Sequence, residues 1–209
     1  MDVLIVVDLQ SDFIDGALGN ETNYEIVKPI DKLVEDFNGE VIFTRDTHDE
    51  NYLETLEGKH LNIKHCVKGT FGWEIRIDTR GNKVIDKPSF GSFDLVNYLC
   101  DLNKREKIDN IYMVGICTDI CVISNAVMIK NALLDTEVIV IEDLCRATSE
   151  KAQKSSLDIL KSVQVNITSL KDLKLANKWS FLEIVLIKII NEYFSMDWLT
   201  CPWNLFIKF

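Results

Sequence analysis

The sequence lacks any apolar run that approaches the ~20 residues a membrane-spanning helix needs, so we expect no membrane span. Its first residues, MDVLIVVDLQSDF, hold only a short apolar stretch with no positive charge before it, which indicates a strand rather than a signal peptide. Basic residues are also few, with 23 Lys and Arg against 33 Asp and Glu and a net charge of −10. Because no basic stripe is available to neutralise phosphates, nucleic acid is excluded as a partner.

Histidine is scarce, at three residues in 209, and the six cysteines come without secretory features. We therefore expect a cytoplasmic protein with mostly free thiols. A single cysteine is most often a small buried hydrophobe, so a catalytic role has to be argued from its neighbours. The remaining composition, 47% hydrophobic and 27% charged residues, is that of an ordinary globular protein long enough for one domain.

Apolar strand-like runs alternate with helix-like segments along the first 170 residues. The runs are typical of strands buried on both faces of a sheet and occupy residues 3–8, 40–44, 83–87, 110–115, 136–143 and 163–168. The helical segments are 23–37, 92–105, 119–134 and 148–162, with Ser92 as one N-cap and Thr148 or Ser149 as another. Pro29 requires an early turn or a kink in the first of them. This alternation predicts an α/β fold with a parallel sheet and helices on both of its faces.

The character of the sequence changes at about Leu173, so we expect a main domain over residues 1–172 and a C-terminal tail over 173–209. The tail holds three of the four tryptophans and an apolar helical stripe from Leu182 to Tyr193, with charged residues opposite. Its simplest interpretation is a helix that packs on the core or on a second subunit. A membrane-surface helix is disfavoured because its charges are few and include acids. A segment foreign to the domain is the third alternative.

Four consecutive strands end in residues that can carry chemistry. Asp8 ends the first strand, Asp46 follows the second, Lys87 ends the third, and Cys117 and Cys121 follow the fourth. In open α/β sheets the ligand binds beyond the carboxyl ends of the strands. We therefore expect two acids, an amine and a thiol at one edge of the sheet, although each alone has an ordinary structural explanation.

The thiol of Cys121 has the setting of an activated nucleophile. If the helix begins near Asp119, Cys121 lies in its first turn, where the helix dipole favours a thiolate. Lys87 would lower the pKa of the thiol further, and the Asp8 carboxylate could accept its proton. The backbone N–H of Cys117 could join that of Cys121 in an oxyanion hole. Two buried cysteines beside an N-cap are the structural alternative.

All three histidines, His48, His60 and His65, fall in the long irregular segment between the second and third strands. Asp46 precedes His48 by two residues, and in an extended segment residues two apart project to the same side. Carboxylate and imidazole groups suit a divalent transition ion such as zinc, manganese or iron. The segment is therefore a candidate metal site, with a polar surface loop as the alternative.

Taken together, these residues resemble a known family. Asp8, Lys87 and Cys121, with GICTDICV around the cysteine, are similar to the isochorismatase-like cysteine hydrolases, and the motifs DTHDENY, EGKH and HCVKGTFGWEI resemble its nicotinamidase branch. The resemblance covers residues 2 to about 170. It implies a three-layer α/β/α fold with a six-stranded parallel sheet in a Rossmann-like order, and a cis peptide bond between Ile116 and Cys117.

The resemblance also implies an activity. Nicotinamidases convert nicotinamide to nicotinate and ammonia in NAD salvage, which here would proceed through a thioester on Cys121. Asp8 would take the thiol proton and pass it to the departing ammonia, while Lys87 holds both groups in register. The oxyanion hole would be formed by the backbone N–H groups of Cys117 and Cys121.

The same resemblance implies one divalent metal ion, zinc before iron or manganese, which binds the ring nitrogen of the substrate. Its ligands would be Asp46, His48 and His65, with Glu57 in the fourth place and His60 as the alternative fourth ligand.

The resemblance places Phe13 as an aromatic wall of the substrate pocket. Asn62 stands where the family often has a tryptophan, so we expect Trp73 or Phe93 to supply that stacking surface. Because the family is often oligomeric, a homo-oligomer is expected as well.

Two alternatives stay open at this point. The first is another hydrolase of the same superfamily, acting on a different small carboxamide, a ureide or isochorismate, although an isochorismatase would not need the Asp/His loop. The second is a metal-binding or scaffold protein that kept the fold without the chemistry.

Overall fold

A computed structural model describes residues 1–173, and Met1–Leu170 form one compact unit. Within it lies a parallel sheet in the order β3-β2-β1-β4-β5-β6. Its strands are β1 (Asp2–Val7), β2 (Glu40–Asp46), β3 (Lys83–Lys87), β4 (Asn110–Ile116), β5 (Glu137–Arg146) and β6 (Asn166–Thr168). The expected α/β fold with a six-stranded parallel sheet is confirmed.

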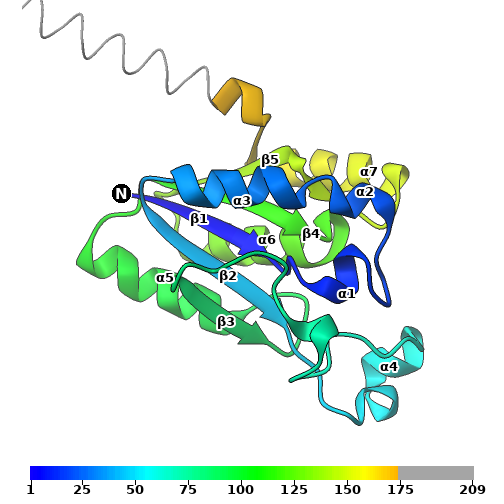
Figure 1. Cartoon of the computed structure of the whole chain (residues 1–209). Coiled ribbons are helices and arrows are strands. Elements are labelled where there is room, and N and C mark those ends of the chain that lie inside the picture. The colour runs from blue at the N-terminus through cyan, green and yellow to red at the C-terminus, as the bar shows by residue number, and fades with distance from the viewer. Residues whose placement is uncertain (174–209) are drawn as a thin grey trace, which may run out of the picture. The chain divides into compact units, whose positions relative to one another are not determined.

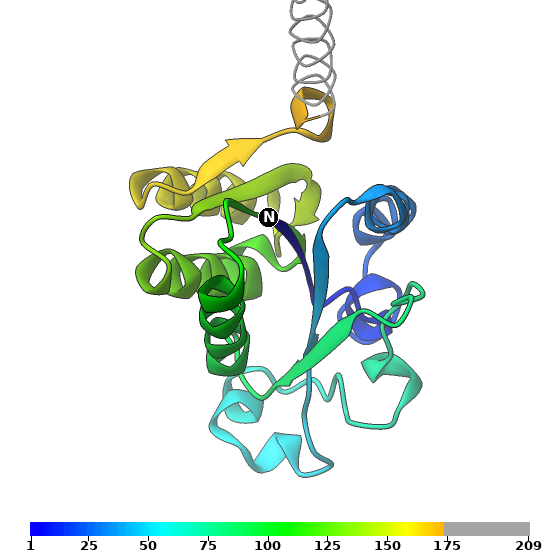
Figure 2. The ribbon, with the colours of Figure 1, turned by 90° about the vertical axis from the view of Figure 1, so that its left-hand side faces the viewer.

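Helices cover both faces of this sheet (Figures 1 and 2). One face carries α5 (Phe93–Arg105), α6 (Ile123–Ala132) and α7 (Glu150–Ser162), and the other carries α1 (Ser11–Ile14), α2 (Glu21–Tyr24) and α3 (Val27–Asp36). The short helix α4 (Leu56–His60) lies beyond the carboxyl end of β2 (Figure 1). The domain therefore has three layers, with the sheet between two layers of helices.

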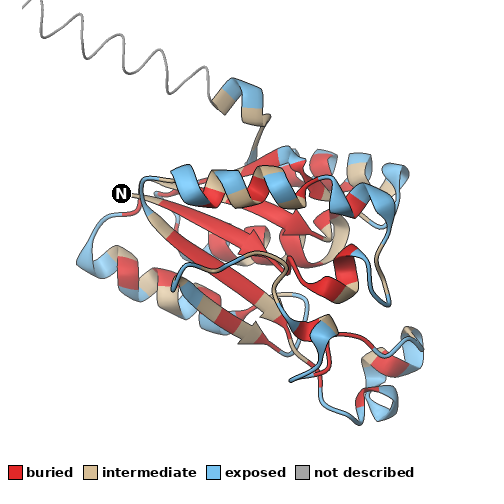
Figure 3. Cartoon of the chain, in the orientation of Figure 1, coloured by how far each residue is buried: buried red, intermediate tan, exposed pale blue. Residues whose placement is uncertain are grey.

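The strands are apolar because both of their faces are covered. Residues 3–7 of β1 are fully buried, as Figure 3 shows for most of the sheet, whereas the helices expose their outer faces. Such central strands have no solvent-facing side, and continuous apolar runs are the sequence pattern that results.

Local capping residues set several helix starts. The Ser92 side chain accepts a hydrogen bond from the Leu95 N–H at the start of α5, and Ser149, rather than Thr148, caps α7 through the Ala152 N–H. Hydroxyl groups suit this position because they pair one of the free N–H groups of the first turn.

Three expected elements differ in detail from the structure. The segment 23–37 is two helices, α2 and α3, with Pro29 in the first turn of α3, where a missing N–H breaks no helical hydrogen bond. The last strand covers only Asn166–Thr168, because α7 continues to Ser162 and Gln164 has a φ of 64°. The helix expected at 119–134 begins instead as a π-helical turn, Thr118–Val122, and becomes α-helical at Ile123.

The chain order reverses at the middle of the sheet. β2 and β3 lie on one side of β1, and β4, β5 and β6 lie on the other. Ligands bind in such sheets at the point where the order reverses, which here lies between β1 and β4. Gly115 has a φ of 122°, and a Cβ atom there would lie 2.0 Å from the main-chain oxygen of Val7. Glycine is required at this position for β4 to pass so close to β1.

None of the helices in residues 1–173 is long and apolar enough to cross a membrane. The five cysteines in this part of the chain are free thiols, as expected. The amphipathic helix expected between Leu182 and Tyr193 lies outside the described residues, and the boundary at residue 172 stays a prediction.

Candidate active site

The carboxyl ends of β1, β2, β3 and β4 bring the expected acids, amine and thiol together. The ammonium nitrogen of Lys87 lies 2.8 Å from Asp8 Oδ2, 3.4 Å from Cys121 Sγ and 3.4 Å from Asp46 Oδ1. Asp8 and Lys87 have no exposed surface, and Cys121 is buried as well. One buried cation thus contacts two carboxylates and a thiol that come from different strand ends.

The register of the sheet brings these side chains together. Asp46 and Lys87 are directly paired at the ends of β2 and β3. Asp8 follows β1 with a φ of 49°, its N–H donates to the Thr44 carbonyl, and the Thr44 hydroxyl donates to Asp8 Oδ1 at 2.7 Å. Thr44 therefore fixes one carboxylate oxygen and leaves the other to Lys87.

Cys121 is presented by the π-helical turn that follows β4. The peptide bond between Ile116 and Cys117 is cis, as the family resemblance implied. The Cys117 carbonyl accepts hydrogen bonds from the N–H groups of Ile120 and Val122 and so closes the turn. An ordinary first α-helical turn was expected here, but the wider π-helical turn carries the thiol.

Asn125 ties this turn to the loop after β3. Its side-chain nitrogen donates to the Cys121 carbonyl at 2.8 Å and to the Phe90 carbonyl at 3.1 Å, and its oxygen accepts from the Ser92 N–H at 2.9 Å. The Ser89 carbonyl in the same loop accepts a hydrogen bond from Lys87 Nζ at 3.0 Å. Sequence reasoning missed Asn125, although a buried polar residue one turn after the cysteine is a usable signal.

The protonation of the buried groups follows from burial and from their charges. Burial raises the pKa of the Cys121 thiol, the Asp8 carboxylate raises it further, and Lys87 opposes both effects. Burial likewise raises the pKa of the Asp8 carboxyl, against the charge of Lys87. The expectation of a thiol with a lowered pKa is therefore wrong for this site, because burial and the Asp8 carboxylate outweigh the charge of Lys87.

A second cluster adjoins the first through Asp46. Asp46 Oδ2 lies 3.0 Å from His48 Nε2 and 3.6 Å from His65 Nε2, and Glu57 Oε1 lies 3.7 Å from His48 Nε2. One ligand atom each from Asp46, His48 and His65 fits within a span of 4.8 Å. This carboxylate–imidazole set matches the ligands of a divalent transition ion.

Neighbouring groups hold these side chains in place. The Gln10 amide pairs with both main-chain groups of Asp46, accepting from its N–H at 2.7 Å and donating to its carbonyl at 2.8 Å. His65 Nδ1 lies 2.8 Å from the Ile63 carbonyl, a contact that leaves Nε2 to face the cluster. The Tyr52 ring packs 4.9 Å from the His65 ring between centroids. Orientation by such outer contacts is typical of metal-ligating histidines.

The charges of the site also fit a divalent cation. The carboxyl groups of Asp8 and Asp46 share the single ammonium of Lys87, and Glu57 adds a third carboxyl group beside His48, so acidic groups outnumber lysine in a largely buried region. Burial would raise the pKa of Asp46, but the contacts with His48 and His65 and the charge of Lys87 outweigh it, so this pKa lies below its ordinary value. An ionised carboxylate is the form that a metal ion binds.

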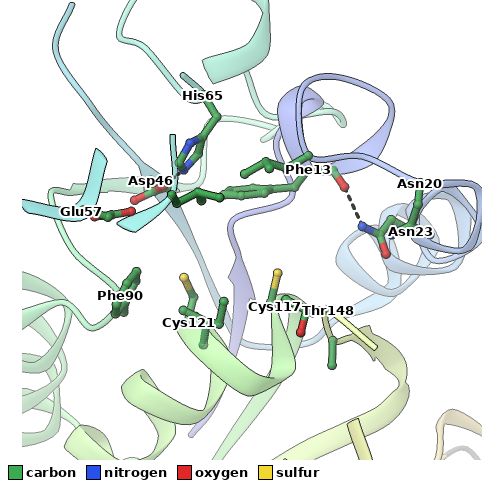
Figure 4. A pocket seen from close by; sticks show the side chains of 14 residues that line it. Phe13, Asn20, Asn23, Asp46, Glu57, His65, Phe90, Cys117, Cys121 and Thr148 are labelled. Atoms are coloured by element: carbon green, nitrogen blue, oxygen red, sulfur yellow. Dashed lines mark hydrogen bonds and ion pairs between the residues drawn. The ribbon is translucent and has the colours of Figure 1, made fainter. Parts of the chain in front are cut away.

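A cavity of about 310 Å³ opens onto both clusters (Figure 4). In Figure 4 the Phe13 ring lies opposite the sulfur atoms of Cys117 and Cys121, and Asp46, Glu57 and His65 lie at one end. Its lining is formed by Phe13, Leu18, Asn20, Asn23, Asp46, Glu57, Leu61, His65, Phe90, Cys117, Ile120, Cys121, Ala147 and Thr148. The volume is near the lower limit of ligand sites, roughly 300–1,000 Å³, and so suits a single-ring molecule.

Three expected site residues lie elsewhere. His60 is exposed at the end of α4 and lies outside the cluster. Trp73 stacks under the Arg45 guanidinium at 3.4 Å and does not line the cavity, and Phe93 is 77% exposed on the first turn of α5. The second phenyl ring that lines the cavity, besides that of Phe13, belongs to Phe90, three residues after Lys87.

Comparison with known proteins gives a consistent result. A family model described as an isochorismatase domain matches residues 2–172. The chain is 27% identical to the nicotinamidase of Saccharomyces cerevisiae, with 72% of this chain and 90% of that protein covered, and 28% identical to the nicotinamidase of Acinetobacter baylyi, with 69% and 80% covered. The solved structure of a pyrazinamidase of Pyrococcus horikoshii in complex with zinc has a TM-score of 0.69 and 25% identity, with 81% of this chain and 99% of that chain covered. This chain therefore belongs to the isochorismatase family.

Proposed function

We propose that the protein is a hydrolase of the carboxamide C–N bond and that it converts nicotinamide to nicotinate and ammonia with the help of one divalent metal ion. The observation that carries the proposal is Lys87, whose ammonium contacts the Asp8 carboxylate, the Cys121 thiol and the Asp46 carboxylate in one buried site. The likeness to two nicotinamidases and to a zinc-containing pyrazinamidase supports this substrate class.

In the first half of the reaction Cys121 is the nucleophile. Its proton passes to Asp8 as the sulfur attacks the carboxamide carbon, and the C–N bond then breaks as Asp8 returns the proton to the leaving nitrogen, which departs as ammonia. During this transfer the Lys87 ammonium stabilises the negative charge on Asp8 or on the sulfur of Cys121. The raised pKa of the Asp8 carboxyl fits this role, because a more basic carboxylate accepts a proton more readily than an ordinary one.

In the second half a water molecule hydrolyses the thioester on Cys121. Asp8 takes one proton of the water as its oxygen attacks the acyl carbon, and the departing sulfur recovers that proton. Both tetrahedral intermediates carry a negative oxygen, for which the backbone N–H groups of Cys117 and Cys121 would be the donors.

The cluster of Asp46, His48 and His65 would hold the metal ion, with Glu57 as the fourth ligand. When bound there, the ion would supply a Lewis acid for the ring nitrogen of the substrate. Phe13 and Phe90 would hold the flat ring between them, so that the carboxamide carbon faces the sulfur of Cys121.

Ammonia release tests the proposal directly. The zinc-loaded protein should release one ammonia for each nicotinate formed from nicotinamide, chelation should abolish most of this turnover, and Cys121→Ala should abolish all of it. His60→Ala is the matched control, because His60 belongs to the same loop but lies outside the cluster. A folded, zinc-loaded preparation that leaves nicotinamide intact would refute the proposal.

A panel of other substrates separates this function from its relatives. Pyrazinamide, benzamide, small ureides and isochorismate can be offered to the same preparation. Because benzamide lacks the ring nitrogen, it should be a poor substrate if the metal binds that atom, whereas preference for a ureide or for isochorismate would identify a different hydrolase of the family.

A further inference from the structure

Asn125 lies on α6, one turn after Cys121, and has no exposed surface. Its side chain makes three hydrogen bonds to main-chain groups, and two of them reach the loop between Lys87 and α5. The amide nitrogen donates to the Phe90 carbonyl and the amide oxygen accepts from the Ser92 N–H. The third bond runs from the same nitrogen to the Cys121 carbonyl. One side chain thus joins the turn that carries the candidate nucleophile to the loop that carries Phe90.

This set of contacts requires a side chain that both donates and accepts. The two carbonyls can only accept and the Ser92 N–H can only donate, so the orientation of the Asn125 amide is fixed. A carboxylate of the same size could accept from the N–H but could donate to neither carbonyl, and an apolar side chain would pair none of the three groups. Because a buried main-chain group without a partner destabilises the folded protein, the position of the loop is tied to an amide at residue 125.

The loop is exposed at the residue that it presents to the cavity. Phe90 is 48% exposed and lines the same cavity as Cys121 (Figure 4). At Gly91 the loop comes so close to α6 that a Cβ atom there would lie 2.4 Å from the sulfur of Met128. The place of the Phe90 ring therefore depends on the contact between this loop and α6, and Asn125 supplies buried hydrogen bonds to that contact.

We propose that Asn125 is a positioning residue of the reaction: it holds the Phe90 loop on the helix that follows the Cys121 turn and so fixes the separation between the Phe90 ring and the attacking sulfur. The inference rests on the proposed function, in which Phe90 contacts the flat ring of the substrate. Asn125 acts through Phe90 and does not touch the substrate itself. Such a device matters because a misplacement of about 1 Å between a bound substrate and a reacting group can cost on the order of 100-fold in rate.

Asn125→Ser separates the bonds to the loop from the bond to the turn. A serine hydroxyl in a helix can donate to the carbonyl four residues earlier, as Ser124 does to the Ile120 carbonyl at 2.6 Å. At position 125 the hydroxyl can therefore replace the bond to the Cys121 carbonyl. It has a single hydrogen and is one atom shorter than the amide, so the two bonds to the loop are lost.

A double-mutant cycle with Phe90→Ala tests whether Asn125 acts through Phe90. Nicotinamide binding is measured by calorimetric titration of zinc-loaded proteins that all carry Cys121→Ala, which prevents turnover. Asn125→Ser should weaken binding roughly 2- to 12-fold, the range that corresponds to one aromatic contact. When Phe90→Ala is also present, Asn125→Ser should cause no further weakening.

A control variant and a second measurement exclude a merely structural role. Asn131 donates to the Val127 carbonyl at 2.7 Å on the exposed side of the same helix, so Asn131→Ser is the matched substitution and should leave nicotinamide binding unchanged. Urea unfolding of the same proteins gives their stability. A purely structural Asn125 would lower stability with or without Phe90 and would leave the affinity of the folded protein unchanged.

The outcomes separate this inference from the proposed function. Unchanged affinity in Asn125→Ser, or equal weakening with and without Phe90→Ala, overturns the positioning role and leaves the function intact. Absence of nicotinamide binding by the protein with native Asn125 and Phe90 overturns both. If Asn125→Ser does not fold, Asn125→Thr takes its place in the cycle with the same expectations, since threonine has the same hydroxyl and a volume closer to that of asparagine.

Discussion

Replacing Lys87 with Met should unbalance the buried charges more than any other single change in the site. Lys87 Nζ contacts Asp8 at 2.8 Å and Asp46 at 3.4 Å, and neither Asp8 nor Lys87 has exposed surface. Removing one partner of a buried ion pair costs about 3–5 kcal/mol, because a charge is left without compensation. For a protein of this size that loss corresponds to a fall of roughly 6–20 °C in Tm.

The double variant distinguishes a charge effect from a packing effect. Asp8→Asn alone leaves Lys87 paired with Asp46, so it should cost less than half as much as Lys87→Met. Adding Asp8→Asn to Lys87→Met should recover at least about 1 kcal/mol, since the uncompensated carboxylate at position 8 is then neutral. Urea unfolding of the four metal-free proteins measures these free energies without a contribution from ion binding.

The pH dependence of the stability loss in Lys87→Met tests whether that loss is electrostatic. Burial raises the pKa of Asp8 and Lys87 lowers it, so the pKa of Asp8 should rise further in Lys87→Met. A carboxyl with a raised pKa in the folded protein takes up its proton as the pH falls, and the stability deficit should therefore shrink from pH 8 to pH 5.5. Additive losses in the double variant, or a deficit that grows on acidification, would refute the charge reasoning.

The remaining predictions concern the two clusters. Cys121→Ala should lower kcat by on the order of 10⁴–10⁶-fold, whereas Cys117→Ala should stay active because only its backbone N–H is proposed to act; equal losses in the steady-state assay would show that the turn is misassigned. His65→Ala should lower zinc affinity by more than ~100-fold, beyond the usual loss for an outer-shell residue, and His60→Ala should retain zinc in equilibrium dialysis. Alkylation of Cys121 by iodoacetamide should accelerate only at alkaline pH, because burial and Asp8 raise the pKa of the thiol. Asp8→Asn should speed alkylation at neutral pH and yet abolish turnover. Slower alkylation of Cys121 in that variant would contradict the assigned effect of Asp8 on the thiol pKa.

The sequence predicted those parts of the molecule that depend on short-range pattern. Apolar runs located the strands, hydroxyl residues located the starts of α5 and α7, and the rule that parallel strands end at one edge brought Asp8, Lys87 and Cys121 together. These features follow from periodicity, capping and topology, which a single sequence records directly.

Other features depend on the path of the chain in three dimensions. Phe90 and Phe93 are close in sequence, but the loop after β3 turns Phe90 to the cavity and leaves Phe93 on the outer surface of α5. Asn125 and Asn23 are polar residues in helices whose partners lie 33–35 and 10 residues away in the chain. The direction of the Cys121 pKa shift could not be predicted either, because it depends on how far burial exceeds the effect of Lys87.

The proposed mechanism requires that Cys121 attack the carboxamide carbon and form a thioester. Mixing the zinc-loaded protein with excess nicotinamide, quenching with acid within the first turnover and mapping peptides by mass spectrometry tests it most directly. The peptide containing Cys121 should gain the mass of nicotinamide less that of ammonia, and hydroxylamine should remove this label. Turnover with no adduct on Cys121 at any quench time, together with ammonia release by Cys121→Ala, would contradict it.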